Sequence, residues 1–425
     1  MLQIFLNSIT TGLFPDVYKV LVVVLPVVMP FLLLYAFWVI RFRYIQMRYI
    51  EKQKKCLLEI KLPKEITKSP AAMEIFFSYM SQGGAGGYAE AFLDGRTRPW
   101  FSCELVSKGG EVHFYIWCSQ VKFKTIIESQ LYAQYPNIEV YEVKDDYTKD
   151  FSFDLNKYSM YALQYTLTKP DPFPIKTYID YGLDKDQKDE YKIDPMTAVL
   201  EFLGSLKAGE NAWIQILVRK HEKEGWKHGK FREGKDLKEE IKVEVKKVRE
   251  STMQDSGDDE SKFKFPNPTK GQNEVIAALE RSGTKIPFDC MIRSIYFAES
   301  SSFNPSNIGG IIGSMRQYGS NSLNGFRPAK TTDVSDTYHD FARVLPFLNK
   351  YMNKEIYDLK KDMFHAYKLR SFFEYPYKNY ECKPFVLTTE ELATIFHFPS
   401  GMVSQTPTLK RVASKKSEAP SNLPL

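Results

Sequence analysis

An uncharged stretch of twenty-one residues, Val20–Ile40, constrains this chain more than any other feature. As a helix rising about 1.5 Å per residue it would span roughly 30 Å, the thickness of a bilayer's hydrocarbon core. Transmembrane helices tolerate prolines such as Pro26 and Pro30. Tyr35 and Trp38 lie near the end of the stretch, and aromatic rings prefer the membrane interface. The sequence therefore predicts a transmembrane helix over residues 20–40.

Two other interpretations stay open for this stretch, a cleaved signal peptide and the buried core helix of a globular protein. A signal peptide has a shorter apolar core, followed by small residues at the cleavage site. Here Ile40 leads directly into Arg41-Phe42-Arg43. That continuation favours the transmembrane interpretation.

Basic residues gather on the C-terminal side of the stretch, whereas Lys19 is the basic residue before it. The positive-inside rule then places residues 1–19 outside the cell and residues 41–425 in the cytoplasm. We therefore expect a single-pass protein of the cell (inner) membrane, with a short extracytoplasmic tail and its bulk cytoplasmic. The residues expected to flank the membrane are Arg41, Arg43, Arg48, Lys52, Lys54 and Lys55.

Composition limits what the part after the anchor can be. About 380 residues remain, enough for two or three domains. The net charge of +6 is modest and suits a protein at a membrane surface better than a dedicated nucleic-acid binder. The five cysteines are an odd number without CxxC spacing, so we expect reduced, mostly buried thiols rather than zinc ligands or disulfides.

The order of expected elements after residue 41 is that of a ferredoxin-like unit. Residues 41–68 are a basic juxtamembrane segment that ends in a first strand, CLLEIKLP. A first unit over residues 69–190 follows, in which Ser69-Pro70 opens a helix as a cap with proline at the first helical position. Its expected elements are a helix over Ala71–Met80, strands Trp100–Ser107 and Glu111–Ser119 joined by a turn at Lys108-Gly109-Gly110, a helix over Val121–Tyr135, and a strand NIEVYEVKD.

The same order recurs over residues 191–332, where Asp194-Pro195 opens the next helix as Ser69-Pro70 opens the first. Any α+β chain can show such an order by chance, but the doubled cap favours an internal repeat. The predicted fold class is α+β: one transmembrane helix followed by two ferredoxin-like α/β sandwich repeats and a flexible tail. The matching segments of the second unit are Ala212–Arg219, Phe288–Ala298, a helix from Asn304 to Tyr318 and a strand near Phe326.

The second unit contains a charged insertion over residues 221–287. We expect it to hold a solvated helix, a disordered acidic loop at Gln254–Ser261 and a short helix around Asn273–Arg281. Its basic run, Lys242–Arg249, is either a solvated helix face or a surface that touches lipid or nucleic acid.

Residues 333–399 form a C-terminal helical and strand segment in this prediction. It comprises a helix over Asp333–Asn353, a strand over Phe364–Phe373 and a short helix over Glu390–Phe396 capped by Thr388 or Thr389. Residues 400–425 are rich in Ser, Pro and Lys and are expected to be a disordered tail.

Motifs of catalysis are missing from the sequence. The stretch SQGGAGGYAEAFLDGRTRP is expected to be a glycine-rich loop. Its run SQGGAGGY lacks the Lys-Ser/Thr pair of a P-loop, and neither HExxH nor GxSxG occurs in the sequence. The six histidines lie apart, without the spacing of metal ligands. We therefore expect no catalytic residue, no cofactor, no metal site and no enzymatic activity.

The segment TTEELATIFHFP, Thr388–Pro399, resembles the one that enters the motor domain in conjugative or type IV secretion ATPases of the HerA/FtsK-like class. Residues 406–424 resemble the linker that follows it there. The stretches LPKEITKSPAAMEIFF and FYIWCSQVKFKTIIESQLYAQYPNIEVYEV resemble the membrane-linked half of those proteins. A P-loop ATPase domain follows in them, whereas this sequence ends at Leu425. The resemblance thus implies an ATPase on a separate polypeptide, or an ATPase-free relative.

Together these features predict a membrane-anchored scaffold or docking subunit for a separate P-loop ATPase of a type IV secretion or conjugation-like machine. Besides the lipid bilayer and that ATPase, the resemblance suggests a homo-oligomer, because ATPases of this class work as rings. The alternative is a membrane-associated nucleic-acid-binding protein that uses the basic insertion and tail, which steep salt dependence of binding would reveal. The residues expected to dock the partner are Thr389, Glu390, Glu391, His397 and Pro399.

Overall fold

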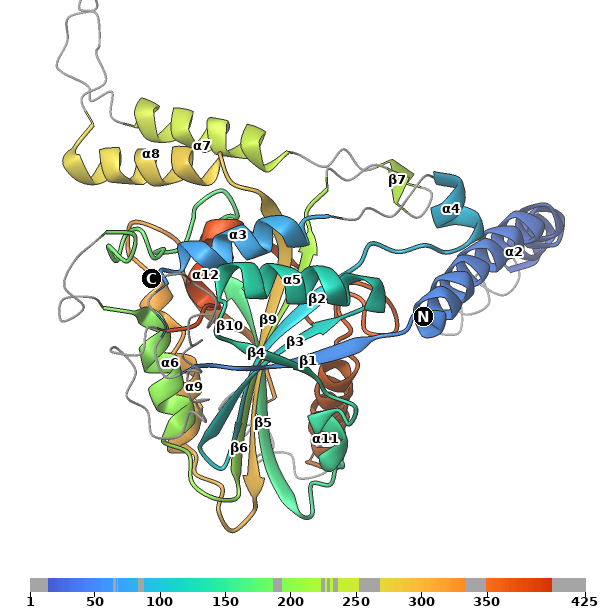
Figure 1. The fold of residues 1–425 in the computed structure, drawn as a ribbon. Helices are drawn as coiled ribbons and strands as arrows, with labels where there is room; N and C mark the ends of the chain where they lie inside the picture. The colour runs from blue at the N-terminus through green and yellow to red at the C-terminus, as the bar shows by residue number, and fades with distance from the viewer. Residues whose placement is uncertain are drawn as a thin grey trace, which may run out of the picture. The chain divides into compact units, whose positions relative to one another are not determined.

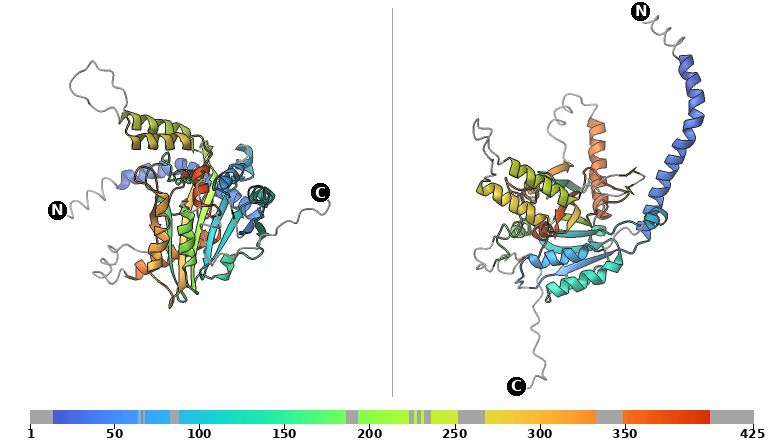
Figure 2. Two further views of the ribbon diagram at one scale, coloured as in Figure 1. Left: turned by 60° about the vertical axis from the view of Figure 1, so that its left-hand side comes forward. Right: turned by 90° about the horizontal axis from the view of Figure 1, so that it is seen from above.

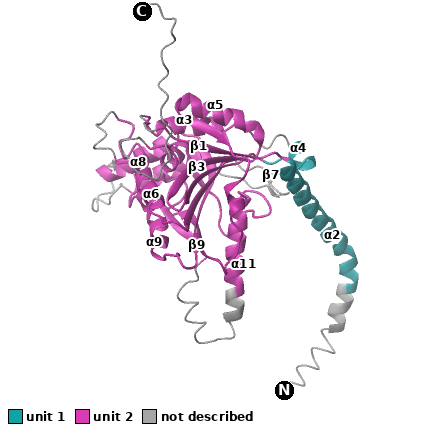
Figure 3. Cartoon of the chain, turned by 60° about the horizontal axis from the view of Figure 1, so that its bottom comes forward, with its two compact units in different colours: residues 1–52, 85–97, 228–230 teal, residues 53–84, 98–227, 231–425 magenta. Residues whose placement is uncertain are grey.

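A computed structural model describes residues 14–63, 66, 68–82, 88–185, 193–222, 226–227, 230–231, 236–251, 268–332 and 349–399. The chain divides into two compact units, coloured separately in Figure 3. The long apolar helix belongs to the first unit and the sheet to the second. Their residues are 1–52, 85–97 and 228–230 for the first, and 53–84, 98–227 and 231–425 for the second.

The first compact unit is dominated by one long helix, α2 (Phe14–Lys52), with Pro26 and Pro30 inside it. The part over Val22–Lys52 is long and apolar enough to cross a membrane. Its most apolar 18 residues have a mean hydropathy of 2.5, and none of them is buried. The helix therefore contains the predicted span and continues without a break to Lys52, past four of the six residues predicted to flank the membrane. A six-residue helix, α4 (Tyr88–Leu93), belongs to the same unit.

The second compact unit is built on one antiparallel sheet, drawn in Figure 1. Its strands are β1 (Cys56–Lys61), β2 (Phe101–Lys108), β3 (Glu111–Cys118), β4 (Glu139–Glu142), β5 (Tyr158–Leu167), β6 (Glu210–Lys220), β9 (Pro287–Glu299), β10 (Phe326–Thr331) and β11 (Phe385–Thr388). Two short strands lie off this sheet, β7 (Trp226–Lys227) and β8 (Lys230–Phe231).

The strand order is β10-β5-β9-β6-β2-β3-β1-β4, which is one pattern used twice. In each half the first strand lies between the third and the fourth, and the second strand follows the third, as in a ferredoxin-like unit. We call β1–β4 repeat 1 and β5–β10 repeat 2. They join where β2 pairs with β6, from Phe101 opposite Val218 to Lys108 opposite Asn211. The predicted fold class is confirmed, and the two repeats share a single continuous sheet.

Helices from both repeats cover one face of the sheet, here called the helix face. Alternate strand residues point to this face and build a single core with the helices, as the period of two in a strand requires. Leu58, Cys103, Ile216 and Ile292 are examples of these core residues. The covering helices are α3 (Ala71–Met80) and α5 (Lys124–Gln134) of repeat 1, and α6 (Pro195–Gly204) and α9 (Ser306–Gly313) of repeat 2.

Local signals in the sequence account for several element boundaries. Gly109 and Gly110 have φ of +58° and +90°, the left-handed values that a tight hairpin between β2 and β3 demands. A Cβ on Gly110 would lie 2.5 Å from the carbonyl oxygen of Leu206, so this turn also needs glycine for space. Within the described residues of this unit, short 3-10 helices lie at Val121–Phe123, Tyr147–Asp150 and Arg316–Tyr318.

The last described segment, residues 349–399, is here called the strap. It begins with α11 (Asn349–Lys368), which packs on the face opposite the helix face, where Trp213 lies 5.4 Å from the ring of Tyr367. The chain then enters the sheet as β11, antiparallel to the start of β9. It ends as α12 (Thr389–Ile395), which packs against α3 and α6 on the helix face. The strap thus contacts both faces of the sheet.

The charged insertion forms two helices, α7 (Leu237–Glu250) and α8 (Lys270–Ser282), which lie side by side in Figures 1 and 2. Their small apolar core includes Ile241 and Leu279 and extends to Val386 of β11. The solvated helix and the short helix of the insertion are therefore both present, and each has an apolar side that is buried.

Three predictions differ from the structure. The segment Phe364–Phe373 was expected to be a strand because of its aromatic residues, but Phe364–Lys368 complete α11. The glycine-rich stretch, expected to be a loop, contains α4. Strand β5 lies in repeat 2, although the range expected for the first unit, 69–190, includes it. The acidic loop at 254–261, residues 333–348 of the expected helix and the tail 400–425 lie outside the described residues.

Candidate functional site

The residues predicted to flank the membrane lie on α2 and just after it. All six are exposed, and four of them follow the apolar stretch on the same helix. Such a cluster next to a membrane span attracts anionic lipid headgroups, by about 1 kcal/mol per basic residue near the surface. These residues are Arg41, Arg43, Arg48, Lys52, Lys54 and Lys55.

The residues predicted to dock a partner lie inside the protein. Thr389, Glu390, Glu391 and His397 are each only 1–3% exposed, and Pro399 is buried as well. They belong to the segment that resembles secretion ATPases, but each charged group has a partner within the second compact unit. In this structure the side chains of Glu390, Glu391 and His397 bond the strap to α8, to the segment around residue 175 and to Asp194, so the docking role predicted for this set is not retained.

The two glutamates of α12 bind groups from three other segments. Glu391 accepts hydrogen bonds from the backbone N–H and the hydroxyl of Thr388, both at 2.8 Å, and from the N–H of Ile175 at 2.9 Å. Burial nevertheless raises the pKa of Glu391 to about 7. Glu390 accepts from Nε of Arg281 in α8 at 3.0 Å. These bonds connect the strap with α8 and with the segment around residue 175.

His397 forms a buried ion pair with Asp194, the residue that caps α6. Its Nε2 lies 3.1 Å from both carboxylate oxygens, and its Nδ1 lies 2.9 Å from the carbonyl oxygen of Ala393. A carbonyl oxygen can only accept, and a carboxylate is best satisfied by a donor, so both ring nitrogens act as donors. Burial opposes the charge, but the Asp194 carboxylate outweighs it and the pKa of His397 is raised above its ordinary value.

A row of polar residues crosses the sheet on the face opposite the helix face. Its members lie on six neighbouring strands, and the strand register places each one opposite the next. Isolated polar groups inside a protein are costly, so the row requires partners from the layer that covers it. The members are Gln164, Arg293, Gln215, Glu104, Tyr115 and Glu59.

Arg370, just after α11, is the main partner of this row. It is 1% exposed, and its Nε and Nη2 donate to the two carboxylate oxygens of Glu104 at 2.9 and 3.0 Å. It also pairs with Asp146, and its carbonyl oxygen accepts from the indole N–H of Trp100 at 2.8 Å. Glu104 is 0% exposed, so this two-pronged contact is a fully buried ion pair.

A second charged cluster surrounds Asp289 at the start of β9. Arg219 donates to its Oδ2 at 3.0 Å, and Nδ1 of His221 lies 2.6 Å from its Oδ1. Burial acts against the charge, but His221 and Arg219 lower the pKa of Asp289 to about 2. Arg219 also donates to Glu374 of the strap at 3.2 Å. This cluster therefore provides another ionic contact between the sheet and the strap.

Arg293 is less completely paired than Arg370. It is 1% exposed, and its Nη2 donates to the carbonyl oxygen of Ser371 at 2.8 Å. Within the described part of the chain its Nε and Nη1 have no hydrogen-bond partner. Burial lowers the pKa of Arg293 to about 10, which leaves it charged at neutral pH.

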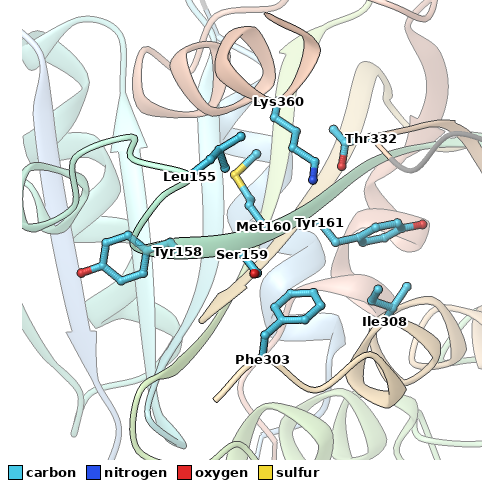
Figure 4. Close-up of a pocket in the computed structure, with 9 residues that line it drawn as sticks. All are labelled: Leu155, Tyr158, Ser159, Met160, Tyr161, Phe303, Ile308, Thr332 and Lys360. Atoms are coloured by element: carbon cyan, nitrogen blue, oxygen red, sulfur yellow. The ribbon is translucent and has the colours of Figure 1, made fainter. Parts of the chain in front are cut away.

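A cavity of about 380 Å³ lies at the start of β5, near α9 and α11 (Figure 4). Its size is within the range of small-molecule pockets. The ammonium group of Lys360 and the hydroxyl of Thr332 point toward each other in this view. No carboxylate or imidazole is among the described residues that line it, so the lining indicates no reaction class. These residues are Leu155, Tyr158, Ser159, Met160, Tyr161, Phe303, Ile308, Thr332 and Lys360.

The charged groups described above bond to other groups of the same chain. Over the described residues, no three His, Cys, Asp or Glu side chains come together to hold a metal ion. All five cysteines are free thiols, and only Cys382 is not buried. The sequence analysis did not single out Glu104, Asp289 or Arg293, although a charge inside an otherwise apolar strand indicates a buried ion pair.

Taken together, the fold defines an α+β protein with one N-terminal apolar helix and two ferredoxin-like repeats in a single antiparallel sheet. The chain belongs to the DUF8128 family, a domain of unknown function, whose model matches residues 88–411. No curated protein matches the chain. The family match names no activity, so the resemblance to HerA/FtsK-like ATPases stays a prediction.

Proposed function

We propose that this protein is a membrane-anchored docking platform for a P-loop ATPase of a type IV secretion or conjugation-like transfer machine, without catalysis of its own. The observation that carries the proposal is α2, whose apolar part is exposed along its length and is followed by basic residues. A water-exposed apolar helix of this length is unfavourable, and a bilayer removes that cost.

The position of the charges supports an orientation. Arg41, Arg43 and Arg48 follow the apolar part of α2, and the positive-inside rule places such a flank in the cytoplasm. In this proposal the protein is a single-pass protein of the inner membrane, its N-terminus is outside and the sheet is cytoplasmic. The orientation is tested by adding a thiol reagent or a protease to one side of sealed membranes and measuring which part of the chain it reaches.

The non-catalytic part of the proposal is supported by where the ionisable groups lie. Several groups have pKa values that are shifted by their surroundings, for example Asp289, Arg370 and Glu391. These groups are buried beneath or within the strap and are paired internally. A substrate would have to displace the strap to reach them. Such a body is suited to presenting a fixed surface to a partner.

The choice of an ATPase as partner rests on the resemblance of Thr388–Pro399 to secretion ATPases. Since that segment is buried here, we assign the contact with the partner to residues 401–425, which lie outside the described residues.

The test is affinity purification from native membranes in mild detergent, with identification of every co-purifying protein. We expect a P-loop ATPase with the full chain and none after deletion of residues 401–425, a deletion that leaves α12 intact. A matched control replaces exposed Lys242 and Lys246 of α7 by alanine and should retain the ATPase. Absence of any ATPase, or its recovery after the deletion, would contradict the proposal.

A second candidate is a membrane-associated nucleic-acid-binding protein. One observation favours it: Lys238, Lys242 and Lys246 are exposed and lie four residues apart, so they form one basic ridge along α7. The ridge is not uniform, because Lys246 pairs with Glu250. Nucleic-acid binding that falls steeply with salt, and that is lost in the Lys242→Ala/Lys246→Ala variant, would support this candidate over the first.

A further inference from the structure

The short helix α4 lies against α2 at the point where the apolar stretch ends. Within the first compact unit, the ring of Phe92 is centred 4.7 Å from that of Trp38 and 5.8 Å from that of Phe42. Ile40 ends the uncharged stretch and Arg41 is the first basic residue after it. Both lie between Trp38 and Phe42 in the sequence. Four residues of helix rise about 6 Å, so α4 lies within one turn of that boundary.

The chain after α4 is fitted closely to α2. Gly95 has φ of +68°, and a Cβ there would lie 2.6 Å from the backbone carbonyl carbon of Ile45. Only glycine permits both this conformation and this approach. Arg96, next in the chain, pairs with Glu90 of α4 and so closes the turn. The contact between α4 and α2 is therefore built into the backbone.

Helix α4 ends in two exposed apolar side chains, Phe92 and Leu93. Leu93 is 65% exposed and Phe92 is 39% exposed, while Trp38 beside them is 41% exposed. Aromatic and apolar side chains flanked by basic residues are typical of segments at the boundary between headgroups and acyl chains. Arg41 and Arg43 on α2 supply the basic groups at this height.

We propose that α4 and the Gly95 turn form a lipid-binding collar, in which Phe92 and Leu93 enter the headgroup–acyl boundary of the bilayer. The collar rests on the proposed function in one respect, that α2 is a membrane anchor. It adds a second contact with lipid at Phe92 and Leu93, about 50 residues after the end of the apolar stretch at Ile40. Two attachment points at one interface would restrict rotation of the helix about its own axis.

The test places a photo-crosslinking benzoylphenylalanine in the full chain, reconstituted in vesicles of neutral and anionic phospholipid that carry a tagged lipid. The photo-crosslinker replaces Leu93 in one variant. It replaces Phe37, an exposed residue of the apolar stretch, in a positive control. It replaces Val243, an exposed apolar residue of α7 in the other compact unit, in a negative control.

We expect lipid crosslinking at position 93 to approach that at position 37 and to exceed that at position 243 at least tenfold. If position 93 crosslinks as little as position 243 while position 37 stays high, the collar is wrong and the anchor remains. If position 37 is low too, the anchor itself fails. Gly95→Ala should reduce crosslinking at position 93 several-fold without changing position 37. An unchanged value at 93 would contradict the role of the Gly95 turn.

Discussion

Helices α3 and α6 hold the same place in the two repeats and begin with the same kind of cap. Ser69 Oγ accepts from the backbone N–H of Ala71 at 3.2 Å, and Asp194 Oδ1 accepts from that of Met196 at 2.8 Å, with a proline next in each case. The difference is that Asp194 also binds His397 of the strap. One local signal thus starts both helices, while the carboxylate in repeat 2 also holds a segment 203 residues away.

The largest effect should come from removing the carboxylate. Asp194→Ala leaves a buried imidazolium without its counterion, and loss of one partner of such a pair costs about 3–5 kcal/mol of unfolding free energy. Urea unfolding of the full chain in detergent, followed by Trp fluorescence, measures it. Asp194→Ser is the control that keeps a cap of the kind found in repeat 1 but not the charge. It should recover only about 1 kcal/mol.

The same pair should make stability depend on pH. The pKa of folded His397 is raised above the ordinary value near 6.5, so its stabilising contribution is complete below about pH 6.5 and is lost as pH rises through the folded pKa. Wild type should therefore exceed His397→Gln in unfolding free energy most at pH 6 and least at pH 9. We compare the two proteins with each other because Glu391 also acts on the wild type. Its pKa is raised to about 7 in the folded protein, so the free energy of unfolding falls as pH rises toward that value in both proteins. A difference that is constant with pH would show that the imidazole is neutral.

A smaller effect is expected in repeat 1. Ser69→Ala removes only a neutral cap at the start of α3, which should cost about 1 kcal/mol of unfolding free energy. This loss should not vary between pH 6 and pH 9, because no charged partner is involved. A loss as large as that of Asp194→Ala would mean that the two caps have equivalent roles after all.

The smallest effect should come from replacing the serine that caps α3 by an aspartate. Ser69→Asp keeps an acceptor for the first turn and places a negative charge at the helix N-terminus, which is favourable by about 0.3–1 kcal/mol. Without a histidine opposite, the variant should gain no more than that. Unfolding at low and high salt measures it, since the helix-dipole contribution is screened by salt.

Elements with their own local signals could be predicted from the sequence. The helix starts at Ser69-Pro70 and Asp194-Pro195 and the turn at Gly109-Gly110 each specify a boundary without reference to the rest of the chain. Strand β5 was not recognised, because it is buried on both faces over most of its length and lacks alternation. The α+β class and both repeats therefore followed from the sequence, but the full extent of repeat 2 did not.

The two parts of the candidate site differ in the same way. The basic flank of α2 was predictable, because charge next to an apolar stretch is a local pattern. The burial of Glu390 and His397 was not, because a polar residue is inside only if a partner meets it there. Their partners, Arg281 and Asp194, are 109 and 203 residues away in the sequence.

The ion pair between Glu104 and Arg370 has a consequence for the order in which the protein is made. Arg370 follows Glu104 by 266 residues, and at about 5–20 residues per second the ribosome needs roughly 15–50 s to reach it. Helix α2 is already complete when this interval begins. The central strand β2, however, lacks the cation that neutralises its buried carboxylate until the interval ends. The sheet therefore cannot reach its final state until the strap emerges, so the whole of α2 exists well before the fold of the sheet is complete.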